Sequence, residues 1–73
     1  MNNILFDQIG KIIEGKHKNW FIKVIDDTNH TGGYYVLICE SNSFITTVYD
    51  DWLENLEDLK QYFLEKKWKI EWE

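Results

Sequence analysis

The apolar positions between residues 3 and 14 recur with the spacing of an amphipathic helix. They are Leu5, Ile9, Ile12 and Ile13. Asn2 or Asn3 caps the start of this predicted helix, and Gly15 fits a cap at its end. Gly10 costs about 1 kcal/mol relative to alanine inside a helix, which indicates close packing against a neighbour.

Three strands follow in the pattern. Residues 20–26 are rich in aromatic and β-branched side chains, and residues 34–40 and 44–49 repeat this character. The polar, glycine-ended segment 27–33 and the short connection 41–42 are turns. Because such short connections do not support parallel crossovers, the three strands are expected to form an antiparallel meander.

Helical spacing returns in residues 56–67, where Asn55 is the expected N-cap and Asp58 takes the acidic place of a capping box. The expected buried stripe of this helix is Leu56, Leu59 and Phe63. Residues 68–73 then alternate strictly between apolar and charged side chains, which is typical of a half-buried strand. Its expected inward residues are Trp68, Ile70 and Trp72.

The pattern therefore predicts one α+β domain over residues 1–73 with the order α-β-β-β-α-β. We expect two helices packed on one face of a four-stranded sheet. The last strand follows a helix, so it is placed at an edge and paired parallel to a meander strand by a crossover.

Composition and charge narrow the classes of function. The net charge is −5, and all eight basic residues are lysines. Nucleic-acid binding is not expected, because it depends on neutralising phosphates. One cysteine, Cys39, and no apolar run longer than 34–39 predict a cytoplasmic protein with no membrane segment.

One candidate partner-binding surface is the sheet face that two helices would leave open. The residues assigned to it are Phe21, Tyr34, Val36 and Tyr49. A contiguous patch of rings indicates contact with a partner or with a second copy in a homodimer. The alternative is ordinary surface apolarity, because more than half of a protein surface is apolar.

A second candidate surface is the acidic connection before the second helix. Its partner-binding residues are Asp50, Asp51, Trp52 and Glu54. These acids favour a basic partner protein, and a tryptophan among them resembles an interface anchor. The alternative is a solvated connection whose acids lie near the positive end of the helix dipole.

No catalytic, cofactor or metal site is expected. Asp27, Asn29 and Thr31 match the first half of a calcium-binding loop, but its twelfth position is Ile38 instead of glutamate. The remaining metal-binding side chains, His17, His30 and Cys39, have no known ligand spacing. No serine or cysteine has an evident neighbouring base.

The α-β-β-β-α order is similar to that of the double-stranded-RNA-binding domain. That family binds phosphates through lysines at the start of its second helix, where this chain has Glu57 and Asp58, so no RNA binding is implied. In size, charge and aromatic content the chain resembles small acidic bacterial or phage immunity proteins. We therefore expect a non-catalytic protein-binding module of the inhibitor or immunity type, with a homo-oligomeric structural protein as the alternative.

Overall fold

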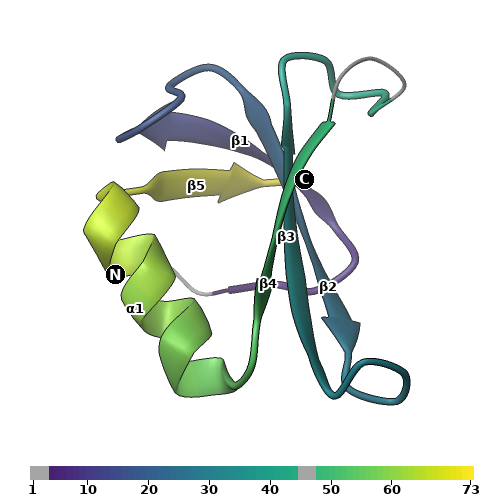
Figure 1. The fold of residues 1–73 in the computed structure, drawn as a ribbon. Coiled ribbons are helices and arrows are strands. Elements are labelled where there is room, and N and C mark those ends of the chain that lie inside the picture. Colours follow the sequence, from purple (N-terminus) through teal and green to yellow (C-terminus); the bar gives the residue numbers. More distant parts are fainter. Residues whose placement is uncertain (1–3, 45–47) are drawn as a thin grey trace.

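The computed structural model describes residues 4–44 and 48–73, which form five strands and one helix. The elements are β1 (Ile9–Glu14), β2 (Phe21–Asp27), β3 (Gly33–Cys39), β4 (Val48–Leu53), α1 (Leu56–Lys66) and β5 (Lys69–Trp72). All neighbouring strands pair antiparallel in one sheet of order β4-β3-β2-β1-β5 (Figure 1). The chain thus links two strands at opposite edges of the sheet, β4 and β5, through α1.

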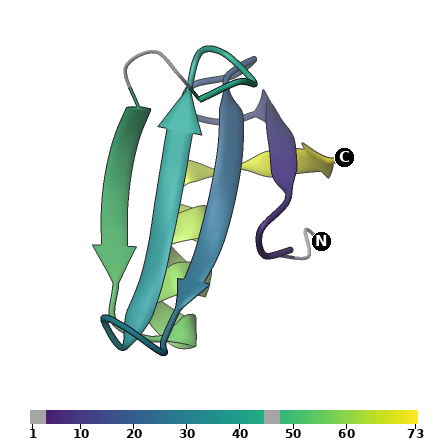
Figure 2. The same cartoon turned by 90° about the vertical axis from the view of Figure 1, so that its right-hand side faces the viewer.

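The sheet curls so that β1 and β5 run across the direction of β3 and β4 (Figure 1). The helix packs on the inside of this curl and lies behind β2, β3 and β4 in Figure 2. We call the side of the sheet that α1 covers the helix face and the opposite side the outer face. No helix in the described part of the chain covers the outer face.

The core lies between the helix face and α1. Alternate residues of β2 and β3 point into it, and their register places Ile22 opposite Ile38 and Val24 opposite Val36. The buried core cluster consists of Ile12, Ile22, Val24, Val36, Ile38, Leu59, Phe63, Trp68 and Ile70. The buried cluster includes side chains from every element except β4, and the half-buried Leu53 of β4 packs against it.

The helix confirms the prediction for residues 56–67 within one residue. Asn55 Oδ1 accepts a hydrogen bond of 2.8 Å from the Asp58 backbone N–H, which satisfies one of the unpaired donors at the helix start. Lys67 adopts a left-handed conformation, with φ of 56°, and ends the helix. Leu59 and Phe63 are buried as expected, whereas Leu56 is 40% exposed and does not belong to the buried stripe.

The prediction of a helix over residues 3–14 is wrong, and its start lies partly outside the described residues. Residues 9–14 form β1, and Gly15 lies in the turn to β2 with a positive φ of 101°. The reason for a strand is visible at Gly10, where a β-carbon would lie 2.5 Å from Ile70 Cγ2 and 2.8 Å from Trp72 Cε3. The glycine indeed marks a close approach, but to β5 and within a sheet.

The third predicted strand is displaced toward the C-terminus. Its expected start, Phe44, has a left-handed φ of 55°, and residues 45–47 lie outside the described part of the chain. The observed strand β4 includes Asp50 and Asp51, which the sequence pattern assigned to a connection. Pairing with β3 extends from Val48 to Leu53 and draws both acids into the sheet.

The alternation of residues 68–73 is confirmed, because Trp68 and Ile70 are buried and Lys69 and Glu71 are exposed. The strand lies at an edge, as predicted, but it pairs antiparallel with β1 instead of parallel with the meander. The fold class of two helices on a four-stranded sheet is therefore wrong. The described chain has one helix on a five-stranded, wholly antiparallel sheet.

Candidate functional site

The strand β4 divides the predicted acidic surface between the two faces of the sheet. Asp51 pairs with the buried Val36 and therefore lies on the helix face, whereas Asp50 and Trp52 lie on the outer face. Glu54 follows the strand and is exposed. The four residues are neighbours along one edge of the sheet, but they do not form a single surface.

The residues assigned to an open sheet face are also separated. Phe21 pairs with Cys39 and lies on the outer face, whereas Tyr34, Val36 and Tyr49 lie on the helix face. Val36 is 1% exposed and belongs to the core, and Tyr34 stacks on Phe6 with 5.6 Å between ring centroids. Of these four residues, Tyr49 remains substantially exposed, at 55%.

Trp52 is held against the outer face rather than projecting freely. Its indole Nε1–H donates a hydrogen bond of 2.8 Å to Thr31 Oγ1 in the β2–β3 turn. A β-carbon on Gly33 would lie 2.5 Å from this ring, so the ring occupies the space beside the glycine. Trp52 is nevertheless 44% exposed at the sheet edge.

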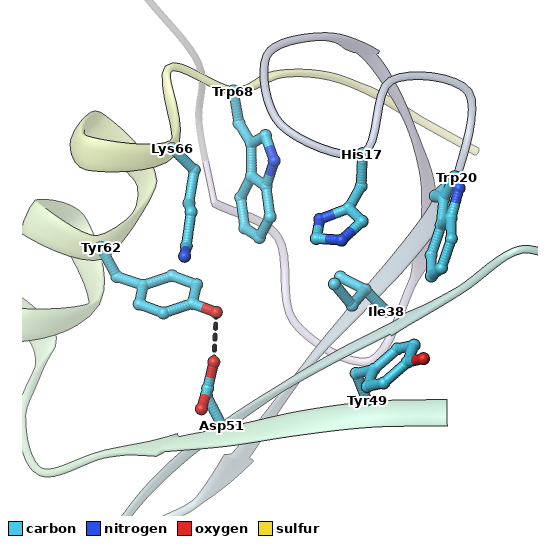
Figure 3. Close-up of a pocket in the computed structure, with 8 residues that line it drawn as sticks. All are labelled: His17, Trp20, Ile38, Tyr49, Asp51, Tyr62, Lys66 and Trp68. Carbon is cyan, nitrogen blue, oxygen red and sulfur yellow. Dashed lines mark hydrogen bonds between the residues drawn. The ribbon is translucent and has the colours of Figure 1, made fainter. Parts of the chain in front are cut away.

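A pocket of about 210 Å³ opens on the helix side of the sheet, between α1, β4 and the start of β2. Figure 3 shows the side chains that line it, which come from distant parts of the sequence. They are His17, Trp20, Ile38, Tyr49, Asp51, Tyr62, Lys66 and Trp68. Four of the eight are tryptophan or tyrosine rings, so the walls are largely aromatic.

A hydrogen bond crosses the pocket wall between α1 and β4. The Tyr62 hydroxyl donates to Asp51 Oδ2 at 2.5 Å (Figure 3). Burial raises the pKa of the Tyr62 phenol well above its usual range, and the hydrogen bond to Asp51 and the charge of that carboxylate raise the pKa further. The phenol therefore remains a donor and holds the carboxylate in place.

The same tyrosine ring carries a cation on its face. Lys66 Nζ lies 5.0 Å from the Tyr62 ring centroid, within the range of a cation–π interaction. Tyr62 and Lys66 are four residues apart on α1, so they lie on the same side of the helix. Among the charged side chains of the pocket, Asp51 is negative and Lys66 is positive.

The opposite wall is formed by the β1–β2 connection. The rings of His17 and Trp20 contact each other with centroids 4.7 Å apart. The Trp20 ring also packs against the Tyr49 ring, with 5.9 Å between the centroids. His17 Nδ1 is buried and has no hydrogen-bond partner among the residues that the structure describes. A buried polar atom without a partner is costly, so this nitrogen is poised to bind a polar group.

Trp68 connects the β1–β2 connection to the end of α1. Its indole Nε1–H donates a hydrogen bond of 2.6 Å to the backbone carbonyl of Lys16. Its ring packs edge-on against Phe63 and Tyr62, with centroids 5.1 Å and 5.6 Å away. The ring is 5% exposed, which makes it both a core residue and the back of the pocket.

The sequence pattern identified Tyr49 and Asp51 but missed the rest of the pocket as a site. Tyr62 and Lys66 carry a usable signal, because an aromatic residue four positions before a lysine on a helix places the cation over the ring. His17 and Trp20 carry no such signal, since they join the pocket only through the fold.

Polar groups of the turn after β2 form hydrogen bonds with one another. The Asp27 carbonyl accepts hydrogen bonds from the N–H groups of His30, Thr31 and Gly32. Hydrogen bonds from the Thr28 hydroxyl and backbone N–H lower the pKa of the exposed Asp26 carboxyl. Over residues 4–44 and 48–73, no three His, Cys, Asp or Glu side chains gather into a possible metal site.

In the same described residues, no helix combines the length and the apolar character that crossing a membrane requires. Comparisons of the chain with protein-family models, with curated proteins and with solved structures give no significant match.

Proposed function

We propose that this chain is a non-catalytic protein-binding module that contacts its partner through a β4 site. This site consists of the β4 edge, from Tyr49 to Glu54, and the adjoining aromatic pocket. The observation that carries the proposal is an edge strand that bears two exposed rings, Tyr49 at 55% on the helix face and Trp52 at 44% on the outer face. Exposed aromatic residues beside a pocket are typical of the central contacts in protein interfaces.

The backbone of β4 supports the same conclusion. In the described sheet β4 pairs with β3 alone, so its other side offers unpaired N–H and C=O groups to an incoming strand. Asp50 and Asp51 oppose the pairing of this edge with the same edge of another copy, because like charges would face each other. A strand with basic side chains is the favoured addition.

The net charge of the whole chain also favours a basic partner. At a net charge of −5 the protein attracts basic surfaces and accelerates their association. Inhibitors and immunity-type proteins that cover a basic site on another protein use this kind of complementarity. We propose this class for the chain.

The test uses the full chain as bait in extract from its source cell, followed by affinity measurements with the captured protein. Asp50→Lys is compared with Glu71→Lys, which makes the same change in net charge at the opposite edge, on β5. We expect Asp50→Lys to slow association and reduce its dependence on salt, and Glu71→Lys to have a small effect. Equal effects of both variants would refute a specific β4 site.

A second candidate, a homo-oligomer joined through the outer face, is favoured by a separate observation. The outer face carries apolar side chains that no described helix covers. Those of β2 and β3 are Phe21, Ile25, Tyr35 and Leu37. Light scattering over a range of concentrations tests this candidate: a growing mass that Leu37→Lys abolishes would support it, and a constant monomer mass would exclude it.

A further inference from the structure

We propose that the aromatic pocket receives an arginine side chain of the partner protein. This inference rests on the proposed function, because it names the group that the β4 site recognises. The guanidinium would lie against the Tyr62 and Tyr49 rings and pair with the Asp51 carboxylate, while its methylene stem would cover Ile38 and Trp20. All of these residues line the same pocket (Figure 3).

The size of the pocket favours a single side chain. Its volume of about 210 Å³ is below the roughly 300–1,000 Å³ that small-molecule and cofactor sites commonly have. The pocket opens beside the exposed Tyr49 on the β4 edge, where a strand added to β4 would pass. In an added strand, alternate side chains point to the helix face, so one of them is directed toward the pocket.

The Asp51 carboxylate supplies the negative partner. Tyr62 donates to Oδ2, and no hydrogen bond to Oδ1 is found among the described residues. A guanidinium offers several N–H donors in one plane and also stacks on aromatic faces, so it can use the free oxygen and the rings together. The chain contains no arginine of its own that would compete for this arrangement.

The pocket already attracts a cation. Lys66 Nζ lies over the Tyr62 ring at 5.0 Å from its centroid, which is an internal version of the contact that we propose. Because a guanidinium is less strongly hydrated than an ammonium group, arginine leaves water for an aromatic site more readily. The partner's arginine would displace Lys66 from the ring toward solvent.

An anionic guest makes the opposite prediction for Lys66. An acidic side chain would use Lys66 and the unpaired His17 Nδ1, and it would be repelled by Asp51. An arginine guest is attracted by Asp51 and opposed by the charge of Lys66. Removing each charge separately therefore distinguishes the two guests by the sign of the change in affinity.

The experiment is a titration of the folded chain, followed by the indole N–H signals of its tryptophans in NMR spectra. The probes are N-acetyl-arginine methylamide, its lysine and aspartate counterparts, and the citrulline analogue, which keeps the shape of arginine without its charge. Trp20 and Trp68 line the pocket, whereas Trp52 lies on the outer face and serves as an internal reference.

We expect the arginine probe at millimolar concentrations to shift the Trp20 signal and to leave the Trp52 signal unchanged. The Trp20 shift should be larger with the arginine probe than with the lysine or citrulline probe. Asp51→Asn, which retains an oxygen for the Tyr62 hydroxyl, should weaken binding about three- to tenfold. Lys66→Met should tighten it about two- to fivefold, because the competing cation is removed. Thermal melts of both variants confirm that they remain folded.

Three results would overturn the proposal. The first is a stronger shift with the aspartate probe than with the arginine probe, together with weaker binding of the aspartate probe to Lys66→Met. The second is an equal shift with the lysine and arginine probes, and the third is no shift with any probe. None of them would refute the β4 site itself, which is tested by Asp50→Lys and Glu71→Lys against the captured partner. If the arginine probe does not bind but Asp50→Lys still slows association with the captured partner, the β4 site is retained and only the proposal that the pocket binds arginine is rejected.

Discussion

Gly10→Ala distinguishes a strand from a helix at the start of the chain by the sign of its effect. In a helix the change would stabilise the protein by about 1 kcal/mol, because alanine has the higher helix propensity. In the sheet the added β-carbon would lie 2.5 Å from Ile70 Cγ2 and 2.8 Å from Trp72 Cε3. Both distances are far below van der Waals contact, so the Ile70 and Trp72 side chains, or the strands that carry them, must shift.

The magnitude follows from the crowding. Overpacking a dense interior destabilises the folded state by roughly 1–3 kcal/mol. Alanine also lowers the conformational entropy of the unfolded chain, which stabilises the protein by about 0.4–1 kcal/mol. We therefore expect a net loss of about 1–2 kcal/mol, which corresponds to a fall in Tm of about 4–8 °C per kcal/mol for a domain of this size. For comparison, a chain of 73 residues has a total stability of about 4–11 kcal/mol.

Urea denaturation followed by tryptophan fluorescence measures this loss. Lys11→Ala is the control, because Lys11 is the exposed neighbour of Gly10 on β1 and its truncation should change stability by less than about 0.5 kcal/mol. In an Ile70→Ala background the cost of Gly10→Ala should shrink, since the crowding methyl group is gone. A stabilised Gly10→Ala protein would refute the pairing of β1 with β5.

Three further results are expected. Asn55→Ala should lower stability by about 0.5–2 kcal/mol in the same urea assay, because the helix loses its N-cap. Trp68→Ala should cost about 3–5 kcal/mol, and Trp68→Phe less, because phenylalanine keeps a large ring in the core although the hydrogen bond to the Lys16 carbonyl is lost. Stability should fall as the pH rises past the ordinary tyrosine pKa of about 10, because the raised pKa of Tyr62 keeps a proton in the folded state that the unfolded chain releases. Tyr62→Phe should make this fall shallower in urea midpoints measured between about pH 9 and 11.

The elements that could be predicted from the sequence are those with their own local signals. The helix α1 has an Asn55 cap, a buried pair at Leu59 and Phe63, and a lysine-rich end. The turn between β2 and β3 has short polar residues and glycines at its end. In both cases the preference lies within a few neighbouring residues, so no tertiary information is needed.

The sequence of the first segment is ambiguous because its apolar residues satisfy two periods. Ile9 and Ile13 are four residues apart, as on one side of a helix, yet residues at this spacing also share a face in a regular strand. β-branched side chains favour the strand, but Gly10 weakens either element by propensity alone. Contact with Ile70 and Trp72, at the other end of the chain, decides between the two.

The faces of the sheet could not be assigned for a similar reason. Both alternate sets of β3 are apolar, so the pattern does not reveal that Val36 and Ile38 face the core while Tyr35 and Leu37 face outward. The register with β2 supplies that information, and register depends on long-range pairing. The open surface predicted from the sequence therefore combines residues of both faces.

The pocket follows from the path of the chain between the sheet edges. Because β4 and β5 are at opposite edges, α1 must cross the helix face to join them. Hydrogen bonds hold it at two places. Tyr62 donates to Asp51 on β4. At the end of the helix, Trp68 donates to the Lys16 carbonyl and the Lys16 N–H donates to the Lys66 carbonyl. The Tyr62 and Trp68 rings and the Asp51 carboxylate also line the pocket, so groups that hold the helix in place form part of the wall of the proposed binding site.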